Sequence, residues 1–211
     1  MEPKLLIFDF WKTLVFSPNR DPRKFYSGLE RFGIGIKEGE EKKFSHLFSK
    51  GMCLSESWED FSKIILENFS TNQTKENIGS FADFLKKKVG FEFYDDVKII
   101  STLPYEKVIL TDSARFLMEP LENMDHFTRI FTPQDTKALK PDLKVFSTVA
   151  EEMSVEPEKT IMVGDDPERD LVPAQKLGMK TVLIDRKDNY KNWRGAKIAT
   201  FKELESTIKG L

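Results

Sequence analysis

Residues 5–14 read LLIFDFWKTL, a hydrophobic run that stops at the carboxylate of Asp9. An uninterrupted apolar run of this length, followed by an acid, is typical of a buried parallel strand, because both faces of such a strand are covered. Ligands of open parallel sheets bind beyond the carboxyl ends of the strands, so Asp9 is placed for chemistry. A lone aspartate after a strand is more often a turn or cap residue, and its assignment therefore depends on the rest of the chain.

The same strand pattern recurs further along the chain. Short apolar runs bounded by polar or turn residues lie at 108–110, 161–163 and 182–184. Amphipathic segments expected to be helices lie at about 113–122, 142–153 and 167–177, with Gly178 at the stop of the last one. Segments 126–131 and 196–200 are candidates for outer strands. This alternation predicts an α/β fold with a three-layer, Rossmann-like parallel sheet core.

The segment 17–94 has a different periodicity, because its apolar residues recur at spacings of three and four without a strand signal. Asp21 and Pro22 are placed as the N-cap and first residue of its earliest helix. Three stripes mark the helices, and we interpret them as the segment's own core: Phe25, Leu29 and Phe32; Trp58, Phe61, Ile65 and Phe69; Ile78, Phe81 and Leu85. We therefore predict a core formed by 1–16 and 95–211, with an inserted α-helical cap domain at 17–94.

Composition excludes several classes of protein. The chain has 211 residues, 32% of them charged, and a formal net charge of -2, whereas a dedicated nucleic-acid binder is normally more basic. No apolar stretch approaches the length of a membrane span, and the first residues lack a secretory signal pattern. The single cysteine, Cys53, fits a reducing compartment, and His46 and His126 lack the spacing of zinc ligands. We expect a cytoplasmic monomer or weak homodimer without membrane or nucleic-acid partners.

A second strand ends in a cluster of acids. Residues 161–170 read IMVGDDPERD, which places Asp165, Asp166 and Asp170 within six positions. Such carboxylates repel one another unless a cation lies between them. Hard oxygen ligands without neighbouring histidine or cysteine suit Mg²⁺. Capping of the following helix by Asp166 is the alternative, and it accounts for one or two of these acids but not for all three.

Two further residues stand at the same predicted edge of the sheet. The run 108–110 leads into the hydroxyl of Thr111, and Ser113 stands at the start of the next helix. Lys140 precedes Pro141, ahead of the helix that leads into the acid-rich strand, where its ammonium group could reach the acids. Taken alone, Thr111 is an ordinary cap or turn residue and Lys140 a solvated charge.

In chain order these pieces resemble the four motifs of the haloacid dehalogenase superfamily, which is dominated by phosphatases. The resemblance spans nearly the whole chain and is carried by Asp9 with Thr13 and Leu14, by Thr111, by Lys140 and Pro141, and by Gly164, Asp165, Asp166 and Asp170. No single motif is decisive, but the ordered set at these separations is specific. The insertion then matches a helical cap that closes over substrate and excludes water.

The resemblance implies that Asp9 attacks the phosphorus of a small phosphorylated molecule and forms an aspartyl-phosphate. Thr111 would hydrogen-bond a phosphoryl oxygen, while Lys140 neutralises charge on Asp9 and on the phosphoryl group. The implied Mg²⁺ ligands are Asp9, the backbone carbonyl of Trp11, and Asp165, with Asp166 or Asp170 in the first or second shell of ligands. The residues expected at the substrate are Thr13, Trp11, Asp112 and Ser113.

The chain departs from this pattern at Trp11. Typical phosphatases of the superfamily carry there a second aspartate that acts as general acid and base, and an indole cannot transfer protons. Lys12, where glycine is common, is a further departure.

Three interpretations accommodate Trp11. The chain is a phosphohydrolase in which a good leaving group, a substrate hydroxyl or Asp112 replaces the acid. Alternatively, it is a dehalogenase or phosphonatase-like hydrolase, because dehalogenases of the superfamily bear an aromatic residue at this position. Dehalogenases need no metal, however, so the acid cluster argues against that branch. In the third interpretation it is a binding or regulatory module that holds phosphate without turning it over.

Overall fold

The computed structural model describes residues 2–18, 22–121 and 126–211. The chain divides into two compact units. The first, here called the sheet unit, comprises Met1–Phe16, Phe93–Thr111 and Pro120–Leu211, and the second, the helical unit, comprises Ser17–Glu92 and Asp112–Glu119. No helix in the described part of the chain is both long and apolar enough to cross a membrane.

Among the described residues, six strands of the sheet unit form one sheet in the order β5-β4-β1-β6-β7-β8. Every neighbouring pair in it runs parallel. The strands are β1 (Leu5–Asp9), β4 (Glu106–Leu110), β5 (Arg129–Phe131), β6 (Thr160–Gly164), β7 (Lys180–Ile184) and β8 (Ala196–Ile198). The central strands are buried along most of their length, which their continuous apolar runs require.

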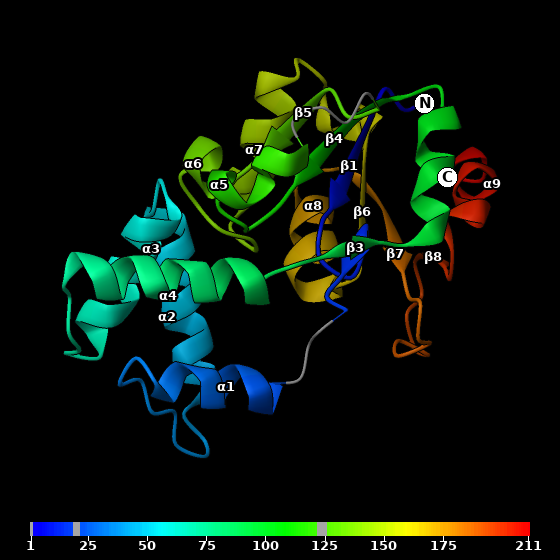
Figure 1. The fold of residues 1–211 in the computed structure, drawn as a ribbon. Helices are drawn as coiled ribbons and strands as arrows, with labels where there is room; N and C mark the ends of the chain where they lie inside the picture. The colour runs from blue at the N-terminus through cyan, green and yellow to red at the C-terminus, as the bar shows by residue number, and fades with distance from the viewer. Residues whose placement is uncertain (1, 19–21, 122–125) are drawn as a thin grey trace. The chain divides into compact units, whose positions relative to one another are not determined.

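Helices cover both faces of this sheet. Figure 1 shows α7 (Leu143–Glu152) and α8 (Val172–Lys176) on one side of the sheet and α9 (Leu204–Lys209) on the other. The remaining helices of the unit are η1 (Asp95–Thr102), η2 (Glu119–Leu121, which begins in the helical unit), α6 (Pro133–Thr136), η3 (Pro157–Lys159), η4 (Pro167–Leu171) and η5 (Phe201–Glu203). The predicted α/β fold class, with its parallel sheet between two helical layers, is confirmed.

Alternation along β1 sends its side chains into two separate cores, because successive residues of a strand point to opposite faces. Leu5 and Ile7 join a buried cluster with residues of α7, η4 and α8, among them Phe146 and Ala174. Phe8 faces the other way, with its ring 5.8 Å from that of Phe201. Asp9 follows the same alternation and points to the face of Ile7.

The helical unit contains α1 (Pro22–Glu30), α2 (Glu41–Leu54), α3 (Trp58–Asn68), α4 (Lys75–Lys88) and the short α5 (Arg115–Met118). Each of the three predicted stripes supplies buried residues to these helices or the turns after them, for example Leu29, Phe61 and Phe81. The interior is aromatic, and the rings of Phe32 and Phe81 lie 4.8 Å apart. The predicted N-cap at Asp21 lies outside the described residues.

Where the chain passes between the units, β2 (Val15–Phe16) and β3 (Glu92–Phe93) pair as a two-stranded sheet that the sequence did not predict. Residues 112–119 join the helical unit, although the sequence analysis assigned all of 95–211 to the core. The reason is that the ring of Phe116 packs 4.9 Å from that of Trp58 and 6.3 Å from that of Phe61.

The helix expected at 167–177 is divided. Its first part, η4, is a π-helix, and α8 follows it. Pro173 has no backbone N–H to donate, so the chain cannot continue a regular α-helical ladder at this point. Gly178, with φ 88°, ends the segment as expected.

Candidate functional site

Strand register brings three chemical groups to one edge of the sheet. Asp9, the last residue of β1, is paired with Leu110 of β4, and the residue before it is paired with Val163 of β6. Thr111 and Asp165 therefore emerge from the strands on either side of β1, just beyond Asp9. All three lie at the carboxyl end of a parallel sheet, where ligands of such folds bind.

Lys140 lies between two of the acids. Its Nζ is 2.5 Å from Oδ1 of Asp9 and 2.8 Å from Oδ1 of Asp170. The Lys140 side chain is only 3% exposed, so its partners and not water satisfy the ammonium group. This meeting follows from the fold, because the loop before α7 and the π-helix η4 both lie on the sheet face to which Asp9 points.

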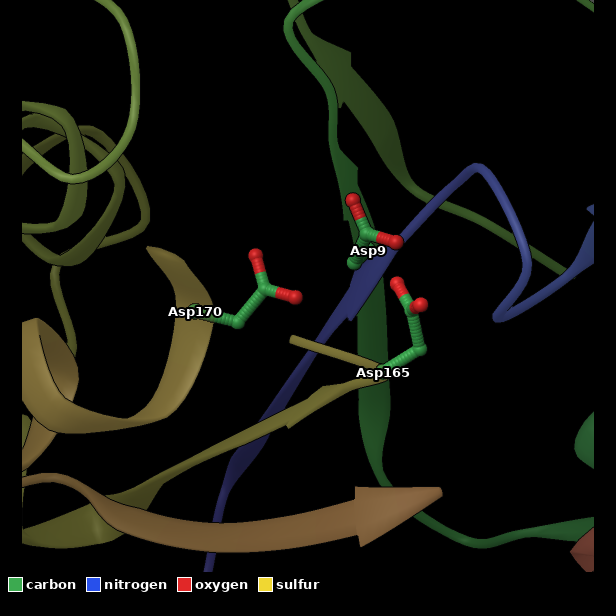
Figure 2. A group of neighbouring side chains, drawn as sticks. All are labelled: Asp9, Asp165 and Asp170. Carbon is green, nitrogen blue, oxygen red and sulfur yellow. The ribbon is translucent and has the colours of Figure 1, made fainter. Parts of the chain in front are cut away.

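Asp165 completes a cluster of carboxylates. One oxygen from each of Asp9, Asp165 and Asp170 lies within 4.8 Å of the others, and Figure 2 shows the three carboxylates directed toward one another. Oδ2 of Asp170 also accepts a hydrogen bond of 3.2 Å from the backbone N–H of Asp166. Gly164 makes room for this arrangement, because a Cβ there would lie 2.4 Å from Oδ2 of Asp170.

Burial and repulsion between neighbouring carboxylates favour protonation of Asp165 and Asp170. Burial, and secondarily the charge of Asp9, raises the pKa of Asp165 to about 6. Burial also raises the pKa of Asp170, while the Lys140 ammonium opposes this rise. Protons and positive charges therefore compete for the same oxygens.

Asp166 and Thr111 make contacts that the sequence left open. Oδ1 of Asp166 accepts hydrogen bonds from the backbone N–H groups of Glu168 and Arg169, which is the N-cap geometry considered above. Its role at a metal ion stays a prediction. Thr111 is buried, and its backbone N–H donates to the carbonyl of Phe131 at 3.0 Å.

The loop after Asp9 is held by backbone hydrogen bonds. The carbonyl of Phe10 accepts from Leu14 and Val15, and the N–H of Lys12 donates to the carbonyl of Val15 at 2.7 Å. Trp11, at the departure from the family pattern, lies in this loop, partly exposed, with its ring 5.5 Å from that of Phe10.

The structure adds Lys12 to the site, which the sequence analysis noted only as a departure. Lys12 adopts φ 62°, and its Nζ lies 3.4 Å from Oδ2 of Asp165. Thr13, predicted to contact substrate, is fully buried, and its Oγ1 has no hydrogen-bond partner among the described residues.

Arg186 anchors this loop, and sequence reasoning missed it. Its guanidinium donates to both carboxylate oxygens of Asp96, at 2.9 and 3.0 Å, and to the carbonyl of Thr13 at 3.0 Å. It also lies 3.8 Å from the centre of the Tyr94 ring. The only local signal was an arginine just after the end of a strand.

Asp112 and Ser113, the other predicted substrate contacts, belong to the helical unit. Ser113 is buried and Asp112 is partly exposed. Their contact with a substrate stays a prediction, as do the functional roles of the other predicted site residues.

A family model described as haloacid dehalogenase-like hydrolase matches residues 6–184. The chain is 34% identical over 68 residues to haloacid dehalogenase-like hydrolase domain-containing protein 3 of Danio rerio, covering 32% of this chain and 28% of that protein. It is 32% identical over 90 residues to glyceraldehyde 3-phosphate phosphatase of Methanocaldococcus jannaschii, covering 40% of this chain and 39% of that protein. The matched stretches thus span less than half the length of these relatives.

Solved structures share the fold across nearly the whole chain. A 2-haloacid dehalogenase from Pseudomonas syringae superposes with a TM-score of 0.72 at 18% identity, covering 99% of both chains. A HAD phosphatase from Thermococcus onnurineus gives 0.65 at 23% identity, covering 98% of both. A HAD family enzyme from Bacteroides thetaiotaomicron, in complex with magnesium and inorganic phosphate, gives 0.61 at 16% identity, covering 89% of this chain and 97% of that one. At these identities the likeness shows the fold alone.

Proposed function

This chain belongs to the haloacid dehalogenase-like hydrolase family, and from that premise we propose that it is a Mg²⁺-dependent phosphohydrolase acting on a small phosphorylated molecule. The observation that carries the proposal is the convergence of Asp9, Asp165 and Asp170 with the Lys140 ammonium at the carboxyl edge of the sheet. Phosphatases among the relatives support the same reaction class.

Asp9 is the proposed nucleophile. One of its carboxylate oxygens forms a bond to phosphorus while the bond from phosphorus to the leaving oxygen breaks. A water molecule then attacks the phosphorus of the aspartyl-phosphate and breaks the bond to Asp9, which releases inorganic phosphate. In sum one water is consumed, its hydrogen atoms are shared between phosphate and the released alcohol, and the Asp9 carboxylate is restored.

Lys140 has two proposed tasks. Its ammonium orients the Asp9 carboxylate through the 2.5 Å contact, and it offsets negative charge that gathers as the phosphoryl group approaches. Asp170 holds Lys140 in place from the other side at 2.8 Å. Because both oxygens of Asp170 accept hydrogen bonds from the protein, we assign it to positioning Lys140 and to supporting the metal site indirectly.

The donor set fits Mg²⁺. Carboxylate oxygens within 4.8 Å of one another are hard ligands, and a divalent cation between them would offset their mutual repulsion. Asp9 and Asp165, with the backbone carbonyl of Trp11, are the proposed ligands, supported by Asp166 or Asp170. When bound there, Mg²⁺ would neutralise charge on the transferring phosphoryl group.

Trp11 narrows the proposed substrates. An indole cannot protonate a leaving oxygen, and loss of a general acid commonly lowers rates by about a hundredfold to ten-thousandfold. We therefore propose that the preferred substrates have leaving groups of low pKa, such as phenols, enols or phosphates. Asp112 or a substrate hydroxyl would relax this restriction if either reached the leaving oxygen.

The test is a hydrolysis screen with Mg²⁺ or with a chelator. It compares p-nitrophenyl phosphate, sugar and nucleotide phosphates, a phosphonate and 2-haloacids. Phosphate release should require Mg²⁺ and vanish in Asp9→Asn. Asp185→Asn is the matched control, because Asp185 also follows a strand and is buried, but bonds the backbone N–H groups of Asn189 and Tyr190. Metal-independent halide release would overturn the proposal in favour of dehalogenation.

A second candidate is a regulatory module with a long-lived aspartyl-phosphate, which Trp11 specifically favours. Without a general base, attack of water on the intermediate is slow even when phosphorylation of Asp9 is not. Stoichiometric labelling of Asp9 by a small phosphate donor, without multiple turnover, would distinguish this candidate from the phosphohydrolase.

A further inference from the structure

We infer that Lys12 is a built-in competitor of the divalent cation, pairing with Asp165 until Mg²⁺ displaces it. The inference rests on the proposed function, because it concerns the regulation of the same site. The observation behind it is the 3.4 Å contact between Nζ of Lys12 and Oδ2 of Asp165.

The backbone places Lys12 where a different residue is expected. With φ 62° the residue lies in the left-handed region, where glycine is favoured and a residue with a Cβ is strained. The hydrogen bond from its N–H to the carbonyl of Val15 fixes this conformation. A strained lysine at a functional edge points to a use for its side chain.

The charges show what that use is. Lys140 neutralises Asp9 and Asp170, both of them buried, but it does not contact Asp165 within the described part of the structure. Lys12 supplies the counter-charge there, and the pKa of Asp165 is raised in spite of it. In the absence of metal, each of the three carboxylates therefore has an ammonium partner.

The exposure of Lys12 would let Mg²⁺ displace its ammonium from Asp165. The side chain of Lys12 is 63% exposed while that of Asp165 is 20% exposed, so the ammonium can move into water without uncovering a buried pair. Exposed ion pairs contribute little free energy of stabilisation, and dissolved salt weakens them further by screening the charges. A divalent ion that also binds Asp9 outcompetes such a pair but loses part of its affinity in doing so.

The experiment measures Mg²⁺ affinity of chelator-treated protein by calorimetry, without substrate. Lys12→Met keeps the length of the side chain and removes its charge, and Lys12→Gly removes the charge while relieving the left-handed strain. Both should bind Mg²⁺ about twofold to fivefold more tightly than the unchanged protein, the equivalent of one exposed ion pair. The difference should shrink in 0.5 M salt, at about three to four times physiological ionic strength.

Lys137→Met is the matched control, because Lys137 is exposed and adopts nearly the same conformation, with φ 54°. Its Mg²⁺ affinity should be unchanged. Equal affinity in the unchanged protein and both Lys12 variants would overturn the inference while leaving the metal site intact. An equal gain of Mg²⁺ affinity in Lys137→Met would also overturn the inference, because the gain would then be a general effect of the lower net charge. Failure of every protein to bind Mg²⁺ would overturn the metal site, and the competition with it.

Discussion

Replacing Lys140 with methionine tests whether the site is held together by charge. The substitution removes an ammonium group that is 3% exposed and lies 2.5 Å from Asp9 and 2.8 Å from Asp170. Removing one partner of a buried ion pair typically destabilises a protein by about 3–5 kcal/mol. For a chain of this size that corresponds to a fall in melting temperature of about 6–20 °C at pH 7.5.

The sign of the pH dependence makes the test specific. Burial raises the folded pKa of Asp170, the buried partner of Lys140, above its ordinary value of 3.8, so the folded state binds this proton more tightly than the unfolded state does. Stability from this group is therefore present below about pH 4 and is lost as the pH rises through the raised pKa of Asp170. Without Lys140 the ionised carboxylates repel one another more strongly. The loss of stability in Lys140→Met should therefore be largest at pH 7.5 and smallest near pH 5, where protons can replace the missing positive charge. Mg²⁺ should recover part of it.

Lys107→Met is the control for this comparison. Lys107 is also buried, but its Nζ donates to the backbone carbonyls of Leu103 and Tyr105, both at 2.7 Å, and not to carboxylates. Its removal should destabilise the protein by about 1–3 kcal/mol, with little dependence on acid pH or Mg²⁺. Thermal unfolding at pH 5 and 7.5, with and without Mg²⁺, measures all three proteins. Equal losses at the two pH values in Lys140→Met would refute the counter-ion reasoning.

Three further predictions follow from single positions. Trp11→Asp should raise kcat/KM for alkyl phosphates by about a hundredfold to ten-thousandfold while changing that for p-nitrophenyl phosphate little, measured by phosphate release; equal gains on both would contradict the leaving-group argument. Gly164→Ala places a Cβ 2.4 Å from Oδ2 of Asp170 and should lower the free energy of unfolding by about 1–3 kcal/mol. Gly79→Ala, with open space around the new Cβ, should not; denaturant unfolding curves of the two variants measure the difference, and equal stability would contradict the steric argument. Burial raises the pKa of Cys53 from 9.0 to about 11, so alkylation at pH 8 should be about a hundredfold slower in the folded than in the unfolded protein, and a rate independent of folding would refute this.

The central strands and the strand-end acids could be predicted because both are local signals. An apolar run such as residues 5–8 indicates a strand by itself, and parallel topology then gathers the strand ends at one edge. The positions of Asp9, Asp165 and Thr111 follow from that rule.

Other features depend on pairs that no local pattern reveals. Arg186 and Asp96 are 90 residues apart, so their ion pair exists only once the fold brings the two segments together. The helix α2 carried no predicted stripe, and only three of its residues are buried: Phe44, Gly51 and Met52. The pairing of Lys12 with Asp165 likewise depends on a left-handed backbone that the residue type itself disfavours.

Sequence spacing could not separate the roles of the acids, but their hydrogen bonds do. Asp166 commits one oxygen to two backbone N–H groups, and Asp170 commits both of its oxygens to Lys140 and the backbone. Asp165, among the described residues, has only the exposed Lys12 as a cationic partner. Asp165, which lies beside Asp9, is therefore the least firmly neutralised acid of the cluster. A cation that enters this edge is drawn to those two acids, so Asp165→Asn should weaken Mg²⁺ binding more than Asp166→Asn does, and the reverse order in calorimetry would contradict this division of roles.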